Sequence, residues 1–137
     1  MSMLPLRFPR LWLGLGWLAV TLAIVVCLMP SNRLPQPPNL SDKSEHFICY
    51  LLLSCWFAGI YPRARYWIIA LGLLVMGVAI EFAQGAMGWG RQADVHDVFA
   101  NSTGIVAGLV LCWWFLGGWA QRLESLVGSL VTGTQKS

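Results

Sequence analysis

The chain alternates long apolar stretches with short polar connections. The apolar stretches cover residues 11–29, 44–61, 66–87 and 97–119. The first has 19 residues and no charge, and a helix of that length extends about 28 Å, close to the hydrocarbon thickness of a bilayer. Prolines and glycines occupy the connections, where helices end. The pattern predicts an all-α, polytopic membrane protein with four transmembrane helices.

The composition agrees with this prediction. The chain is 57% hydrophobic and only 11% charged, whereas a soluble domain carries about 25% charged residues and needs them to cover its surface. The net charge is +3 and the basic residues occur singly or in pairs, which argues against a nucleic-acid partner. We disfavour a cleaved signal peptide, because no small-residue cleavage site follows the first stretch. Residues 1–137 are therefore expected to form a single membrane domain.

The basic residues are distributed unevenly between the two sides of the membrane. The N-terminus, the second connection and the C-terminus hold Arg7, Arg10, Arg63, Arg65, Arg122 and Lys136, against Arg33, Lys43 and Arg91 on the other side. Cytoplasmic segments carry the excess of Lys and Arg, so both termini are predicted to be cytoplasmic. The start of the second helix, the end of the third and the start of the fourth then reach the outer, periplasmic face.

These outer helix ends hold most of the polar residues. Lys43, His46 and Tyr50 fall on one side of the second helix, and Asp42 lies one turn before His46. The third helix carries Glu81 and, one turn above it, Gln84. Glu81 lies within the apolar stretch, and placing a carboxylate inside the membrane costs about 2–3 kcal/mol of free energy. Glu81 should therefore face protein or water and have a partner. Arg91, His46 and Lys43 are the candidates.

The fourth helix has one face that is polar outside and free of side chains further in. Asp97, Asn101, Gly104 and Gly108 recur at steps of four, three and four residues, which predicts close contact with another helix. The two glycines form a G-x-x-x-G pattern that serves packing within a chain or a homo-oligomer; packing is the commoner use in a four-helix protein. His96 projects away from this face.

The charges at the outer ends do not balance. Asp42, Glu45, Glu81, Asp94 and Asp97 outnumber Lys43 and Arg91, so protons, a cation or a cationic ligand must compensate. A metal site built from His46, Glu81, Asp94 and Asp97 is chemically possible. The sequence lacks a compact ligand motif such as H-E-x-x-H, so no metal is predicted and the cofactor stays open. In the simplest interpretation Lys43 and Arg91 pair with two of these carboxylates, and Asp94 and Asp97 are stabilised by the positive N-terminal end of the fourth helix.

Several polar motifs follow one another on successive apolar stretches. They read Asp42-Lys43-x-x-His46-Phe47-x-x-Tyr50, then Glu81-x-x-Gln84, then Arg91-x-x-Asp94-x-x-Asp97-x-x-x-Asn101-x-x-Gly104. This series resembles the VanZ-like membrane proteins over residues 42 to 108. The resemblance implies a protein of the bacterial cytoplasmic membrane. The best-known relative is linked to low-level resistance to the glycopeptide teicoplanin.

Two functions from different classes fit the polar cluster. In the first, an outward polar pocket binds or modifies an envelope lipid or a glycopeptide; Asp42, Lys43, Tyr50, Gln84, Arg91, Asp94, Asp97 and Asn101 are its candidate ligand-binding residues. In the second, the protein is a membrane-embedded hydrolase or transferase with His46 or Glu81 as general base and Lys43 and Arg91 stabilising negative charge. A proton-coupled carrier is less favoured, since four spans without an internal repeat make a thin transporter.

Overall fold

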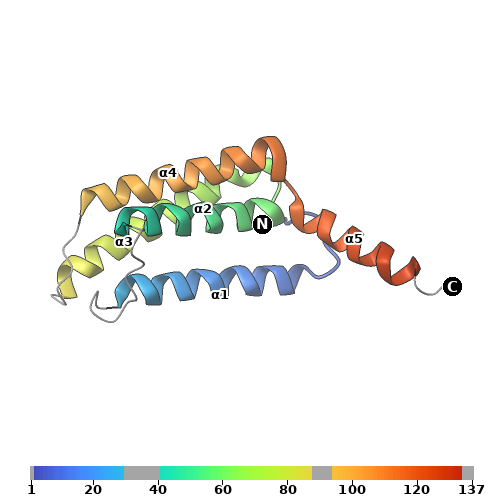
Figure 1. The fold of residues 1–137 in the computed structure, drawn as a ribbon, viewed down its shortest axis with the longest axis horizontal. Helices are drawn as coiled ribbons and strands as arrows, with labels where there is room; N and C mark the ends of the chain where they lie inside the picture. Colours follow the sequence, from blue (N-terminus) through green and yellow to red (C-terminus); the bar gives the residue numbers. More distant parts are fainter. Residues whose placement is uncertain (1, 30–40, 88–93, 134–137) are drawn as a thin grey trace.

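The computed structural model describes residues 2–29, 41–87 and 94–133, and this part of the chain is helical without strands. Its elements are α1 (Pro9–Leu28), α2 (Asp42–Ile60), a short turn η2 (Arg63–Arg65), α3 (Tyr66–Met87), α4 (Val95–Leu111), a π-helical turn η3 (Cys112–Leu116) and α5 (Trp119–Gly133). Figure 1 shows α1 to α4 lying alongside one another, with α5 projecting from the end that holds the N-terminus. The all-helical prediction is confirmed.

Three of the described helical segments are long and apolar enough to cross a membrane: Pro9–Leu28, Arg63–Met87 and Val95–Leu116. The sequence predicted four such segments. The predicted span that is not among them is α2. It is a helix of 19 residues, but its first two turns include the polar residues Lys43, Glu45 and His46. Three apolar helices, together with the composition, indicate a membrane protein, whereas the fourth span stays a prediction.

The main core cluster takes buried side chains from all four helices: Val20 of α1, Tyr50 and Leu53 of α2, Leu73 of α3 and Ile105 of α4. The most extensive contact between helices joins α2 to α4, and the glycines of α4 make it possible. A methyl group on Gly104 would overlap the carbonyl oxygen of Phe47, and one on Gly108 would overlap the Ser54 hydroxyl. The close helix contact predicted for this face is therefore present, and it is made within the chain.

Helix α1 packs more loosely on the bundle. Only Gly16 and Val20 are buried along it, while large apolar side chains such as Trp17, Leu18 and Leu22 are more than half exposed. Exposed apolar surface on this scale needs a cover, and bilayer hydrocarbon is one. An apolar groove of about 400 Å³ runs between α1, the end of α2 and α3, lined by side chains from Leu13 to Ile24 and from Arg65 to Met76.

The last predicted span ends earlier than expected. Residues 97–119 were predicted as one helix, but α4 ends at Leu111, passes through η3 and stops at Gly117 and Gly118. Gly118 has a φ of 67°, a left-handed conformation that glycine adopts without steric cost. This turn redirects the chain into α5, where Leu123, Leu126, Val127 and Leu130 are all exposed. An amphipathic helix with an apolar stripe suits a membrane interface.

At this end of the bundle, α5 is attached to α1. The Glu124 carboxylate accepts hydrogen bonds from the backbone N–H groups of Arg7 and Phe8, at 2.6 and 3.0 Å, and from the Trp12 indole at 2.8 Å. Desolvation opposes ionisation of Glu124, but these donors together outweigh it and lower the pKa of the carboxyl group. Glu124 thus satisfies N–H groups at the start of α1, which has no side-chain cap of its own.

Candidate functional site

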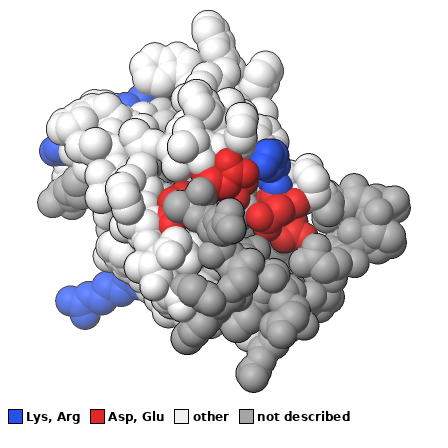
Figure 2. All heavy atoms as spheres, turned by 90° about the vertical axis from the view of Figure 1, so that its left-hand side faces the viewer, with Lys and Arg blue, Asp and Glu red and all other residues white. Residues whose placement is uncertain are grey.

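The polar residues gather at the opposite end of the bundle. Five of the six acidic residues of the chain are at this end: Asp42, Glu45, Glu81, Asp94 and Asp97. Figure 2 looks onto this end and shows the acidic side chains close together with a basic one beside them. They come from the first turns of α2 and α4 and from the last turns of α3. The sequence prediction that three helix ends converge here agrees with this arrangement.

Local sequence explains where the two helices of the cluster begin. Ser41 is the N-cap of α2 and its hydroxyl accepts the N–H of Ser44, and Asp94 is the N-cap of α4 and accepts the N–H of His96 at 2.8 Å. Both residue types are preferred at N-caps because they satisfy otherwise unpaired N–H groups. Asp42 and Asp97 in the first turns also interact favourably with the positive ends of the helices.

Lys43 connects α2 with α4. Its ammonium group lies 2.9 Å from Asp94 Oδ2 and 3.7 Å from Asp97 Oδ1. The hydrogen bond between Lys43 and Asp94 raises the pKa of the lysine and is the main cause that lowers the pKa of the aspartate. About half of the Lys43 side chain is exposed, whereas Asp97 is only 8% exposed. Lys43 thus reaches the surface while it holds the first turns of two helices together.

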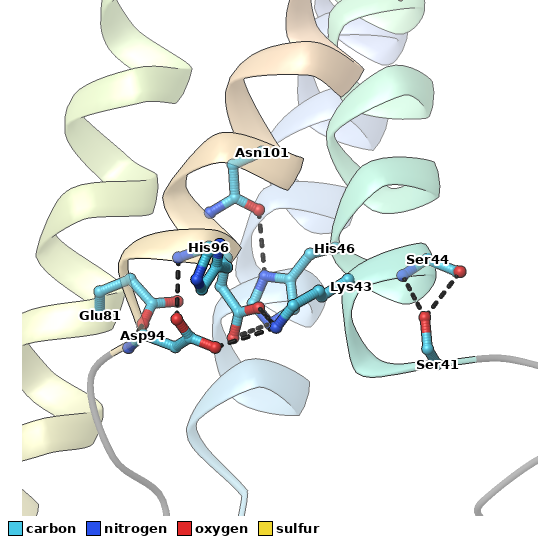
Figure 3. A network of polar contacts seen from close by, with 9 residues as sticks. Ser41, Lys43, Ser44, His46, Glu81, Asp94, His96 and Asn101 are labelled. Atoms are coloured by element: carbon cyan, nitrogen blue, oxygen red, sulfur yellow. Dashed lines mark hydrogen bonds and ion pairs between the residues drawn. The ribbon is translucent and has the colours of Figure 1, made fainter.

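His46 is buried beneath Lys43 and is fixed by two neighbours on α4. Its Nδ1 lies 3.0 Å from Asn101 Oδ1, and its Nε2 lies 3.9 Å from Asp97 Oδ2. Figure 3 shows Asn101 on the inner side of His46, with Lys43 toward the loops. His46 is 4% exposed and Asn101 is 1% exposed, so packing as well as hydrogen bonding sets the orientation of the ring.

Glu81 joins α3 to the start of α4. Its Oε2 accepts the backbone N–H of Asp94 at 3.0 Å, and Figure 3 shows the two side by side. The residue is 4% exposed and its Oε1 accepts no hydrogen bond within the described residues. Glu81 lies six positions before the end of α3 at Met87, which puts its backbone about 9 Å inside the helix end.

The remaining predicted residues lie at the edge of the cluster or below it. Gln84 donates a 2.7 Å hydrogen bond to the Cys27 carbonyl and so connects α3 with α1. Tyr50 is 1% exposed and packs in the apolar core. His96 is exposed, as the sequence indicated, and Arg91 lies outside the described residues.

A small cavity borders the cluster on the side of α1. It has a volume of about 80 Å³ and is lined by Asp42, Glu45, His46 and Cys49 of α2 and by Ala23, Val26 and Cys27 of α1. Ala23 also precedes Ile24, which lines the apolar groove described above. The small cavity and the apolar groove therefore occupy successive positions along α1, the cavity between α1 and α2 and the groove between α1, the end of α2 and α3. Sequence reasoning predicted an outward polar pocket but gave α1 no part in it, and it did not predict the groove, because no pattern in α1 distinguishes a loosely packed helix from any other apolar span.

The fold and the cluster define a helical membrane protein with a buried polar network at one end of its bundle. A sequence model of the VanZ/LLP1 family matches residues 25–116, a range that contains all three helix ends of the cluster. The chain belongs to the VanZ/LLP1 family, as the resemblance of its motifs implied. No curated protein and no solved structure matches the chain.

Proposed function

We propose that the chain is a bacterial inner-membrane protein whose polar end faces the periplasm and binds the headgroup of an envelope lipid or a glycopeptide. Membership of the VanZ/LLP1 family supports a membrane protein of this kind. The excess of Lys and Arg in the termini and the second connection supports the orientation. In this proposal α2 is the fourth span: His46 is covered by α4, and the exposed Asp42 and Lys43 lie at the outer end of the helix.

The observation that carries the proposal is the succession of cavities along α1. An amphiphilic molecule has a polar headgroup and an apolar tail, and the apolar groove of about 400 Å³ is followed along α1 by a small cavity that the side chains of Asp42, Glu45 and His46 border. Ligand sites are typically apolar, with a few convergent polar groups that fix orientation. The half-exposed Lys43 is the described cation at the polar end and would contact an anionic headgroup.

Native mass spectrometry of the purified protein tests this proposal. We would use phosphatidylglycerol as the anionic lipid probe and teicoplanin as the glycopeptide probe. Lys43→Ala should weaken binding of the preferred probe about tenfold, the loss of one charge-assisted contact. Arg10→Ala removes the same charge at the opposite end of the bundle and should bind as the wild type does. Equal binding by all three proteins would contradict the proposal.

A genetic experiment extends the test to cells. We would compare envelope lipid profiles and teicoplanin susceptibility in the wild type, a deletion strain, and strains complemented with the wild-type gene, Glu81→Ala or Arg91→Ala. The proposal predicts that the deletion changes at least one of these properties and that only the wild-type gene restores it fully. Identical results in all strains would exclude a role on envelope lipids or glycopeptides.

The orientation of His46 favours one second candidate, a membrane-embedded hydrolase or transferase. Asn101 and Asp97 face the two ring nitrogens of His46 at 3.0 and 3.9 Å, and a base held between two fixed groups suits proton transfer. Glu81 is the alternative base. Glu81→Gln keeps the shape of the side chain and removes its basicity, so full turnover of a candidate lipid-linked substrate by that variant would exclude Glu81.

A further inference from the structure

Three side chains of the cluster are placed as the ligands of a cation would be. Asp42, His46 and Asp97 each offer one ligand atom, and these three atoms all lie within 4.8 Å of one another. Asp42 and His46 are separated by four residues on α2 and so share one face of that helix, while Asp97 enters from the first turn of α4. Metal–ligand distances of about 2.0–2.2 Å for nitrogen and oxygen hold two ligand atoms of one ion at most about 4.4 Å apart, so a small approach of these side chains would complete the site.

The orientation of His46 is that of a metal ligand. Its Nδ1 lies 3.0 Å from Asn101 Oδ1, an amide oxygen that can only accept, so Nδ1 donates this hydrogen bond and in the neutral imidazole the lone pair is on Nε2. Nε2 then faces Asp97 Oδ2 at 3.9 Å. In the neutral form two acceptors then face each other in a buried site, an arrangement that either a proton on Nε2 or a metal ion between them satisfies. A histidine held through its second nitrogen is the usual arrangement at metal sites.

The carboxylate of Asp97 gives independent support. Asp97 is 6% exposed and its Oδ1 is buried without a hydrogen-bond partner among the described residues. The nearest described cation, Lys43, lies 3.7 Å from that oxygen and makes its 2.9 Å contact with Asp94 instead. The positive ends of α2 and α4 offset part of the negative charge, yet a buried carboxylate oxygen with no donor still favours an ion.

We propose that Asp42, His46 and Asp97 form a binding site for a divalent transition-metal cation. One imidazole and two carboxylates suit Zn²⁺ and Mn²⁺ better than Ca²⁺ or Mg²⁺, which prefer oxygen ligands alone. Asn101 is a positioning residue that fixes the imidazole. Three protein ligands leave coordination positions open, and an anionic headgroup can occupy one of them. This last step rests on the proposed function, and it explains how an anion binds beside five carboxylates.

Calorimetric titration of the full chain in detergent, after dialysis against a chelator, tests the site with Zn²⁺ and Mn²⁺ as probes. The proposal predicts one ion per chain. Asp97→Asn and Asp42→Asn should each weaken binding at least tenfold; Asp42 is exposed, so its substitution leaves the fold intact and keeps the test decisive. Glu45→Gln removes a carboxylate that lines the same cavity but lies outside the triad, and it should bind within about threefold of the wild type.

The role of Asn101 in positioning the His46 imidazole can be tested separately, through metal affinity and the spectrum of bound Co²⁺. Loss of a residue that orients a metal ligand costs about 10- to 100-fold in metal affinity, so Asn101→Ala should weaken Zn²⁺ binding by that factor. Asn101→Gln, which retains an amide oxygen, should recover part of the loss. The absorption spectrum of bound Co²⁺ would change in Asn101→Ala if the residue positions His46, and would stay the same if it only stabilises the helix pair.

The outcomes separate this inference from the proposed function. No binding of either ion, or equal loss in Glu45→Gln and Asp97→Asn, would overturn the metal site. Lipid binding that persists unchanged in the presence of chelator would also overturn the link between ion and headgroup, and would leave the proposed function standing. Stoichiometric ion binding that the triad variants abolish supports the site, even if neither lipid nor glycopeptide binds and the proposed function fails.

Discussion

At the scale of single residues, the polar end is a set of specific pairs rather than a diffuse field of charge. His46 pairs with Asn101, Glu81 with the backbone of Asp94, and Lys43 with Asp94. Buried polar groups are costly unless their partners are in place. Each pair also joins two different helices, so the network holds together the helix ends that line the site.

The pair of His46 and Asn101 can be tested through stability. Asn101→Ala removes the partner of a buried imidazole nitrogen and should lower the free energy of unfolding by about 1–3 kcal/mol. Thr103→Ala, on the same helix, removes an exposed hydroxyl that bonds only to its own helix, and should change stability by less than about 0.5 kcal/mol. Reversible unfolding in mixed micelles measures both. Equal effects would show that the buried pair has no special role.

The pair of Lys43 and Asp94 predicts a pH dependence. The pKa of Asp94 is lowered in the folded protein, chiefly by its hydrogen bond with Lys43. The stabilisation of the fold by this pair is therefore fully present above the ordinary aspartate pKa of about 4. It is lost as the pH falls through the lower pKa of the folded state. An NMR titration of the Asp94 carboxyl carbon should therefore have its midpoint below that ordinary value.

Lys43→Ala should move this midpoint back up, while Lys43→Arg should keep most of the shift. An Asp94 midpoint that is the same in the wild type and in Lys43→Ala would mean that the contact does not form in solution.

At the scale of helices, the small residues of α4 decide how the elements pack. Gly104 and Gly108 allow α4 to approach α2 closely enough that the first turns of both helices share His46, Asp97 and Lys43. The sequence predicted a close contact on this face from the spacing of the glycines. It could not identify α2 as the partner, because every apolar helix offers a compatible surface. Whether copies of the chain associate stays a prediction.

A matched pair of glycine substitutions tests this packing. Gly104→Ala would force the added methyl group against the backbone of Phe47 and should destabilise the protein by about 1–3 kcal/mol. Gly72→Ala introduces the same group where nothing lies within 4 Å, and should be neutral or stabilising by up to about 1 kcal/mol. Thermal unfolding in detergent measures the difference. A neutral Gly104→Ala would contradict the close contact.

The end of α4 shows where periodicity is not enough to locate a boundary. The apolar run continues from Cys112 through Trp114 and Phe115, so hydropathy alone extends the span to Trp119. The chain instead turns at Gly118 because the Trp119 indole packs on Gly59 and donates to the Cys55 carbonyl at 3.0 Å. Such a tertiary contact overrides a local pattern, and a single sequence carries no sign of it.

At the scale of the whole molecule, the two ends of the bundle have opposite character. One end holds the acidic cluster, and the other holds the aromatic group of Trp12, Trp56 and Trp119 with the N-terminus and α5 beside it. The sequence predicted the cluster because ionisable residues are rare in apolar spans and each is visible there. The cavities along α1 depend on how loosely that helix packs, and single-sequence patterns do not encode this.

Cysteine labelling tests the predicted orientation. In a cysteine-free background, a single cysteine would be introduced at Ser41 near the polar cluster or at Ser125 on α5. A membrane-impermeant maleimide should label Ser41→Cys in cells with a permeabilised outer membrane, and Ser125→Cys only after the inner membrane is opened. The reverse pattern would mean that the acidic cluster faces the cytoplasm and that no periplasmic ligand reaches it.

The central claim is that the polar end and the groove along α1 together bind an amphiphilic envelope molecule. An NMR titration of the 15.2 kDa protein in micelles with phosphatidylglycerol measures this most directly. We predict saturable shifts in the signals of Lys43 at the polar end and of His46 and Ala23, which line the small cavity, and much smaller shifts in Lys43→Ala. Shifts that are confined to α5, or that grow without saturation along every apolar helix, would contradict the account.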